Sequence, residues 1–212
     1  MKIKDILCAF FLLSTIARGQ TVVADLVADY SGDPLSHGWT YLWNPQGPVG
    51  TSSGYIKLEW DADHQDGQWD VSHETWPNPA DGSGFLNIRR PADMSNFLAG
   101  HPGEGTNTPT GMAAPKYVIL CYTLADSGTY SITNSALASV AADSGGLQFQ
   151  VYVNDTQMAK GVVAPGQTIP FDKELGGLKK ADRIYVAVAP RDGTMDFKDY
   201  FTISYQIEKK NP

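Results

Sequence analysis

The stretch YVILCYTL, residues 117–124, decides the fold class, because an extended chain of this composition is apolar on both faces. A second stretch, RIYVAVAP at residues 183–190, has the same character. Apolar residues on both faces are typical of strands buried in the centre of a sheet. The two stretches therefore predict central strands of a β-structure that is covered on both sides.

Three further segments alternate between apolar and polar residues, which predicts strands with one buried face. In segment 55–61 the predicted buried face carries Ile56, Leu58 and Trp60. The other two segments are GLQFQVYVN (146–154), expected to be wet on one side, and DYFTISYQIE (199–208). Turn residues separate the segments at short intervals, and helical periodicity is almost absent. We therefore predict an all-β fold, an antiparallel β-sandwich.

Two long connections interrupt this pattern, from about residue 61 to 83 and from 91 to 115. Long connections in compact domains are usually functional or disordered, and the two tryptophans in the first, Trp69 and Trp76, argue against disorder. The sequence of the second connection predicts one short helix in PADMSNFLAG (91–100), with Pro91 at its start and Gly100 as its stop.

Residues 1–19 have the pattern of a secretory signal peptide. Lys2 and Lys4 precede an apolar run that is too short to span a bilayer comfortably, and Ala17 and Gly19 favour cleavage after Gly19. No second apolar run follows. We expect an exported protein, extracellular or periplasmic and not inserted in a membrane, in which residues 20–212 form a single β-sandwich domain.

Charge and cysteine content narrow the function classes. The chain has a formal net charge of −7, and loss of residues 1–19, with three basic residues and one acidic residue, brings it to −9. A negative surface without a Lys/Arg cluster repels phosphate backbones, which argues against nucleic acid as a partner. Only Cys121 remains in residues 20–212, within an apolar strand, so we expect a buried, inert thiol and a fold stabilised by its core.

Four segments of the second half of the chain form a recognisable series: DSGTYSIT (126–133), GGLQFQVYVNDT (145–156), FDKELGGLKKADRIYVAVAP (171–190) and DGTMDFKDYFTISYQIE (192–208). In these segments the chain resembles bacterial carbohydrate-binding modules of the galactose-binding-like type, which are jelly-roll β-sandwiches. Ala181 replaces the glycine that the family pattern has before Asp182. The segment GWTYLWNPQGPVG (38–50) is similar to the front of exported proteins that share this back half. The resemblance implies a secreted β-sandwich whose partner is a polysaccharide or another glycan.

All five tryptophans and all four histidines lie between residues 37 and 101. Trp39, Tyr41 and Trp43 alternate along one predicted strand, so their rings share a face. We interpret them as core residues, with a sugar-stacking platform as the alternative.

The first long connection carries the candidate ligand site. Aromatic faces next to polar side chains suit a pyranose, which has both an apolar face and hydroxyl groups. The candidate ligand-binding residues are Trp69, Asp70, His73, Glu74, Trp76 and, in the turn AGHPGEG, His101. The alternative is that the two tryptophans only fix the connection to the sandwich.

The segment EWDADHQDG (59–67) is similar to the catalytic ExDxxE strand of one glycosidase family. His64 stands in place of the second glutamate, which removes one of the two carboxylates that hydrolysis needs. Its aspartates also approach a calcium loop, with one residue too many for an EF-hand. We prefer a hairpin turn rich in aspartate.

Asp192 and Asp196 precede the last predicted strand, and Asp25 and Asp29 lie on the first. Modules of the resembled class often hold a structural calcium where the terminal strands meet. The resemblance therefore implies calcium at Asp192 and Asp196, with help from the N-terminal strand; solvated turn carboxylates are the alternative. Zinc is disfavoured, since no HExxH or paired CxxC pattern occurs.

Three functions stay open. The preferred one is a secreted, non-catalytic polysaccharide-binding β-sandwich that holds a glycan with its aromatic-rich loops, and it assigns no catalytic residue. The second is a small jelly-roll polysaccharide lyase or glycoside hydrolase. The third is a structural cell-surface or matrix protein without a ligand. Motifs of serine hydrolases, P-loop enzymes and dinucleotide-binding enzymes do not occur in the sequence.

Overall fold

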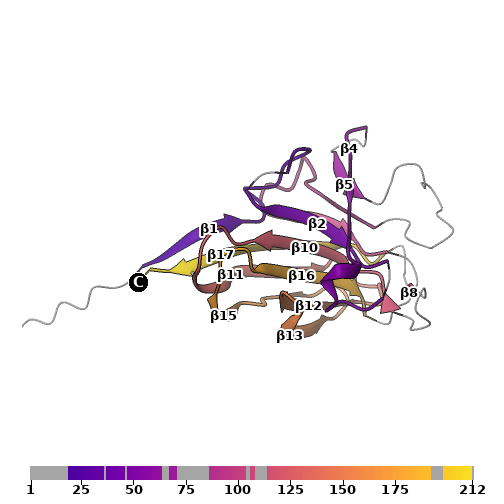
Figure 1. Cartoon of the computed structure of the whole chain (residues 1–212). Coiled ribbons are helices and arrows are strands. Elements are labelled where there is room, and N and C mark those ends of the chain that lie inside the picture. The colour runs from indigo at the N-terminus through magenta and orange to yellow at the C-terminus, as the bar shows by residue number, and fades with distance from the viewer. Residues whose placement is uncertain are drawn as a thin grey trace, which may run out of the picture.

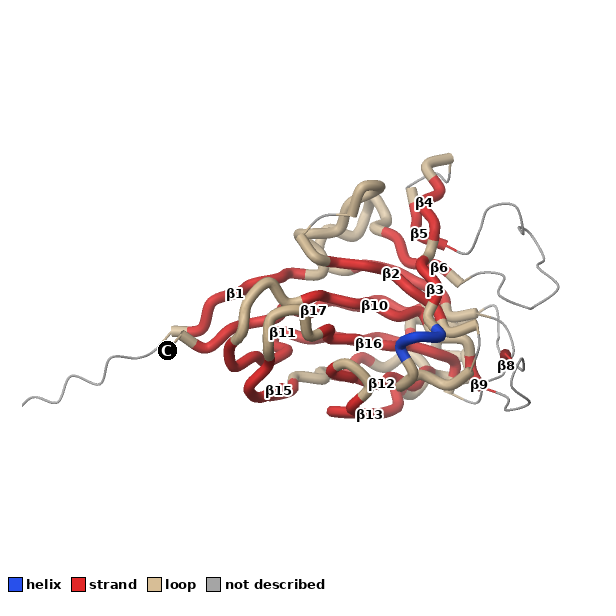
Figure 2. Tube along the Cα trace, in the orientation of Figure 1, coloured by secondary structure: helices blue, strands red, loops and turns tan. Residues whose placement is uncertain are grey.

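The computed structural model describes residues 19–35, 37–45, 47–63, 67–70, 86–103, 106–107, 114–191 and 198–211. Within these ranges the chain is built of strands and turns, with one 3₁₀ helix, η1 (Ser52–Gly54) (Figure 2). Two antiparallel sheets pack against each other over a shared apolar core (Figure 1). The predicted all-β antiparallel sandwich is confirmed.

Sheet A has nine strands in the part of the chain that the structure describes. Its order is β14–β11–β17–β7–β6–β5–β4, with β15 also paired to β11 and β1 to β17. The strands are β1 (Gln20–Asp25), β4 (Glu59–Asp61), β5 (Gln68–Asp70), β6 (Asn87–Arg89), β7 (Leu98–His101), β11 (Gly128–Ser139), β14 (Thr168–Ile169), β15 (Lys173–Leu178) and β17 (Phe201–Lys210).

Among the described residues, sheet B has six strands, in the order β13–β12–β16–β10–β2–β3. They are β2 (Trp39–Trp43), β3 (Ile56–Lys57), β10 (Val118–Thr123), β12 (Leu147–Val153), β13 (Thr156–Val163) and β16 (Arg183–Pro190); a separate pair is formed by β8 (Thr106–Asn107) and β9 (Ala114–Pro115). The two stretches that are apolar on both faces become β10 and β16, which lie side by side in the centre, as predicted.

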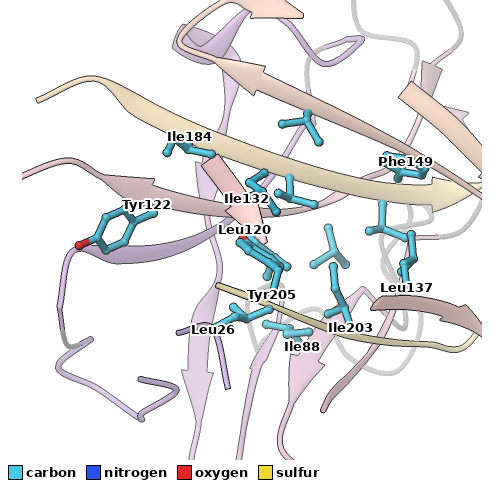
Figure 3. Packing of buried hydrophobic residues seen from close by; sticks show 14 of the residues in the cluster. Leu26, Ile88, Leu120, Tyr122, Ile132, Leu137, Phe149, Ile184, Ile203 and Tyr205 are labelled. Carbon is cyan, nitrogen blue, oxygen red and sulfur yellow. The ribbon is translucent and has the colours of Figure 1, made fainter. Parts of the chain in front are cut away.

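The core lies between the inner faces of the two sheets, where side chains of both, among them Ile203 and Leu120, fill the space (Figure 3). The predicted alternation along β17 is confirmed, with every second residue from Phe201 to Ile207 buried. The three aromatic side chains of WTYLW are also buried on one face of β2, so the core interpretation is confirmed.

A second apolar cluster covers part of the outer face of sheet B. It consists of Val49, Tyr117, Ile119, Cys121, Tyr152, Tyr185, Ala187 and Ala189. The expectation that one whole face of β12 is exposed to solvent is therefore wrong at Tyr152, which packs in this cluster. Cys121 is a free, buried thiol, as expected, and burial raises its pKa to about 12.

Segment 55–61 is divided between the two sheets. β3 pairs with β2 in sheet B, β4 pairs with β5 in sheet A, and Leu58 lies between them. The alternation of buried residues is interrupted at this crossing. The prediction that Ile56 faces the core is therefore wrong, and its side chain is 48% exposed. The Asp-rich hairpin is confirmed, because β4 and β5 are antiparallel neighbours.

The predicted helix over residues 91–100 is wrong. Residues 91–97 form turns and bends, and residues 98–101 form β7, between β6 and β17. Gly100 does not end a helix. It lies against Phe201, and a Cβ atom at this glycine would clash with the Phe201 ring. Pairing with β17 and β6 outweighs the local helix signals.

Candidate functional site

Trp69 lies in β5 and is only 1% exposed. Its ring centroid is 5.8 Å from that of Tyr41 and 5.5 Å from that of Trp60. A ring enclosed in this way offers no free face to a sugar. The predicted stacking role of Trp69 is therefore wrong, and the alternative, that this tryptophan fixes its segment to the sandwich, agrees with the packing.

Asp70 and His101 are also buried. Asp70 Oδ2 accepts a hydrogen bond from Gln68 Nε2 at 2.8 Å. His101 ends β7, and its ring meets that of Tyr200 edge to face with centroids 4.7 Å apart. The remaining candidates, His73, Glu74 and Trp76 for the ligand and Asp192 and Asp196 for calcium, lie outside the described residues.

A pocket of about 340 Å³ opens on sheet A, where the turn after β1, the segment after β6 and the strands β11 and β17 meet. Polar side chains supply most of its lining. The lining residues are Asp25, Val27, Ala28, Arg90, Ser95, Asn96, Asn134, Ser204, Tyr205 and Gln206.

A β-bulge brings Asn134 to this pocket. The register between β11 and β17 shifts between Thr133 and Ala136, and Asn134 has a φ of 49°. Asparagine tolerates this left-handed conformation better than most residues, and bulges redirect side chains next to functional sites. Asp172 supports the bulge, since its Oδ1 accepts hydrogen bonds from the backbone N and the Oγ of Ser135 at 2.9 and 2.6 Å.

Three side chains from three strands form a chain of hydrogen bonds along the pocket. Asn134 Nδ2 donates to Gln206 Oε1 at 2.7 Å, and Gln206 Nε2 donates to Asp25 Oδ2 at 2.8 Å. Asp25 Oδ1 accepts from the backbone N of Val27 and of Ala28 at 3.0 and 2.9 Å. The chain fixes the orientation of both amides. Each amide keeps a second N–H, and Asn134 keeps its carbonyl oxygen, for a ligand.

Arg90 adds a cation to the same lining. Its guanidinium carbon lies 5.6 Å from the centroid of the Tyr30 ring, and Tyr30 Oη donates to the backbone oxygen of Ile88 at 3.1 Å. Nε and Nη2 of Arg90 are buried and have no hydrogen-bond acceptor among the described residues. Buried donors of this kind cost free energy, and in native structures each needs an explanation, such as a functional role.

The pocket combines donors, acceptors and both signs of charge. Asp25 is the one carboxylate among its lining residues, and its two oxygens already accept three hydrogen bonds. Such a carboxylate orients other groups and is poorly suited to proton transfer. The arrangement therefore suits recognition of a ligand with many hydroxyl groups.

The N-terminal aspartates do not fit a calcium site. Asp29 Oδ2 accepts from the backbone N of Asp25 at 2.9 Å and from Trp39 Nε1 at 3.2 Å. Carboxylate oxygens directed at N–H donors are not arranged to converge on a cation. Across the residues that the structure describes, no group of three or more His, Cys, Asp or Glu side chains is placed to hold a metal ion.

Asn134, Gln206 and Arg90 were not predicted as site residues from the sequence. The bulge that carries Asn134 left one signal in the sequence. The apolar residues Ile132 and Leu137 both face the core, although five positions separate them. Strict alternation allows only even separations between residues on one face, so this spacing indicates an irregularity in the strand.

Comparisons with known proteins found similar solved structures but no related sequence. No family model and no curated protein matches the sequence. Among solved structures, the chain is similar to the CBM51 module of a Clostridium perfringens GH95 in complex with methyl-galactose, with 11% identity over 59% of this chain and 81% of that one and a TM-score of 0.33. It is similar to the CBM36-1 domain of a multidomain xylanase from the hindgut metagenome of Trinervitermes trinervoides, with 7% identity over 82% and 98% and a TM-score of 0.32. It is also similar to a CBM36 module in complex with calcium and xylotriose, with 14% identity over 53% and 92% and a TM-score of 0.28.

At these sequence identities and TM-scores, the ligand of this chain has to be inferred from its own residues. In the part of the chain that the structure describes, no helix has the length and apolar character needed to cross a membrane.

Proposed function

We propose that the protein is an exported, non-catalytic carbohydrate-binding β-sandwich that holds a glycan in the pocket around Asp25, Arg90, Asn134 and Gln206. The observation that carries the proposal is the chain of hydrogen bonds from Asn134 through Gln206 to Asp25 inside an open pocket. A sugar hydroxyl both donates and accepts, and fixed amides offer both functions. The charges of Asp25 and Arg90 offset each other, which favours a neutral, hydroxyl-rich ligand.

The predicted loop residues belong to the same proposal as a second set of contacts. Trp76 would supply an aromatic face, with His73 and Glu74 as polar neighbours, in the connection between β5 and β6. Calcium held by Asp192 and Asp196 would stabilise the segment before β17. Trp69 and Asp70 are left out of the contact surface because the core buries them.

Retention of the purified exported protein on a polysaccharide panel tests the pocket. We expect at least one polysaccharide to retard the wild type in affinity electrophoresis. Gln206→Ala removes the middle of the hydrogen-bond chain, and Asn134→Gly removes its end while keeping a residue that tolerates positive φ. Both variants should bind about tenfold more weakly, which corresponds to about 1.4 kcal/mol.

Asn154→Gly is the matched control. Asn154 also has a positive φ, 52°, but it lies in the turn between β12 and β13, where its Nδ2 donates to Asp182 Oδ1 at 3.0 Å. This variant should bind like the wild type. A wild type that no polysaccharide retards, or a Gln206→Ala variant that binds unchanged, would overturn the proposal. New reducing ends or unsaturated uronate absorbance during incubation would overturn its non-catalytic part and favour the lyase or hydrolase.

A further inference from the structure

A second pocket, of about 480 Å³, lies beside the first on the same face of sheet A. Ser95 and Asn96 line both pockets, so the two pockets share one wall. The other lining residues of the second pocket are Asp93, Met94, Phe97, Ala138, Ser139, Val140, Gly166, Thr168 and Thr202.

The strand registers align the two pockets along β17. Thr202, in the second pocket, pairs with Ala138 of β11 and Ala99 of β7. Gln206, in the first, pairs with Thr133 of β11 and Asp25 of β1. The extended chain from Thr202 to Gln206 is about 13 Å long. This distance exceeds the length of one pyranose ring.

The second pocket is more apolar than the first and ends near an exposed aromatic ring. Val140 is 53% exposed and Tyr200 is 45% exposed. The backbone N of Val140 donates to the backbone oxygen of Tyr200 at 3.0 Å, which places the two residues side by side just beyond the paired ends of β11 and β17. Tyr200 directly precedes β17, and the alternation of that strand, continued by one residue, puts Tyr200 on the same face as Thr202 and Gln206. The buried ring of His101 contacts the Tyr200 ring from the side and positions it.

We infer that the two pockets form one groove, which binds an extended glycan chain and not a single terminal sugar. The hydroxyl groups of one unit would occupy the polar pocket at Asn134 and Gln206. A later unit would lie with its apolar C–H face on Val140 and Tyr200, since sugar rings stack on aromatic and aliphatic surfaces. The inference rests on the proposed function and adds to it the length of the ligand and its path along β17.

Dependence of affinity on chain length tests the groove. Cello-, xylo-, manno- and galacturono-oligosaccharides, each from monomer to hexamer, are titrated into the wild type by calorimetry. In a series that binds, we expect affinity to rise about tenfold or more from monomer to tetramer and then to level off. Equal affinity at every length would overturn the groove and leave the polar pocket as a site for one unit. A wild type that binds no series would overturn the groove together with the proposed function.

Variants at the Val140 and Tyr200 end of the groove distinguish the contribution of the second pocket from that of the first. Val140→Ser and Tyr200→Ala should weaken binding of the tetramer about five- to tenfold and leave binding of the monomer unchanged. Gln206→Ala should weaken every length by the same factor. Val162→Ser is the control, because Val162 is 57% exposed but lies on β13 of the other sheet. If Val140→Ser and Tyr200→Ala bind the tetramer as tightly as this control, the second pocket takes no part and the groove is overturned.

Discussion

Trp69 Nε1 donates a hydrogen bond to the backbone oxygen of Ser31 at 2.9 Å, and this bond ties β5 to the segment that precedes β2. The ring is enclosed as well, so Trp69→Ala removes the bond and opens a cavity. We expect the free energy of unfolding to fall by about 3–5 kcal/mol, as measured by urea denaturation. Ile56→Ser, at an exposed position, should change it by less than about 0.5 kcal/mol. A Trp69→Ala variant as stable as this control would contradict the buried position.

Ala181 has a φ of 70°, in the region that disfavours every residue with a Cβ atom. This is the position at which the resembled family has glycine. Ala181→Gly should raise the free energy of unfolding by about 0.5–1 kcal/mol, since relief of the strained conformation exceeds the entropy that glycine adds to the unfolded chain.

Gly176→Ala provides the reverse experiment. Gly176 has a φ of 82°, and an added Cβ atom there would meet nothing within 4 Å. Any loss of stability therefore comes from the backbone conformation alone, and we expect about 1 kcal/mol in a thermal or urea melt. Opposite shifts in the two variants are the expected result; a destabilised Ala181→Gly would refute the strain.

Asp182 makes part of the stability depend on pH. Hydrogen bonds from the backbone N of Lys179 at 2.7 Å and from Asn154 Nδ2 at 3.0 Å lower the pKa of its carboxyl. A carboxyl whose pKa is lower in the folded chain stabilises the fold above the unfolded pKa of about 3.9, and this contribution disappears as the pH falls through the folded value. Asp182→Asn should therefore be less stable than the wild type at pH 7, by less than about 1 kcal/mol because the group is near the surface. The difference should vanish in urea melts at the lowest pH; a constant difference would argue against the lowered pKa.

The thiol of Cys121 should be unreactive in the folded protein. Burial raises its pKa to about 12, so almost no thiolate is present at pH 8. Ellman's reagent should release no colour from the native protein within the time in which it titrates one thiol per chain in denaturant. Rapid labelling of the native protein would place Cys121 at the surface.

The calcium ion proposed at Asp192 and Asp196 would make the melting temperature depend on the metal. A ligand that binds only the folded state stabilises it, by about 2.7 kcal/mol at a concentration one hundred times its Kd. Calcium should raise the melting temperature of the wild type and EDTA should lower it, whereas Asp192→Asn combined with Asp196→Asn should remove the response. A wild type indifferent to both additions excludes a structural calcium.

The strands with regular alternation were predictable, because alternate residues of a strand face opposite sides and this pattern can be read from the local sequence. In β17 the alternation of apolar residues indicates one covered face, whereas the continuous apolar run of β10 indicates that both of its faces are covered. At Leu58 and Asn134 the parity breaks, through a crossing between sheets and through a bulge. The helix signals of residues 91–100 were also local, and they were outweighed by pairing with β17, a strand about one hundred positions away.

The candidate pocket could not be predicted in the same way. Asp25 and Gln206 are 181 positions apart and meet only because β1 pairs with β17. The concentration of tryptophan drew attention to residues that fill the core, since a large aromatic side chain serves packing and ligand contact equally well. Amide side chains such as those of Asn134 and Gln206 carry no comparable signal in a sequence.

The passage of the chain through Leu58 also couples the two layers mechanically. β3 belongs to sheet B and β4 to sheet A, and a single buried residue joins them. Separation of the β4–β5 hairpin from the edge of sheet A would therefore also pull β3 away from β2. We expect the amides of this hairpin to exchange with solvent in the same opening event as those of β2.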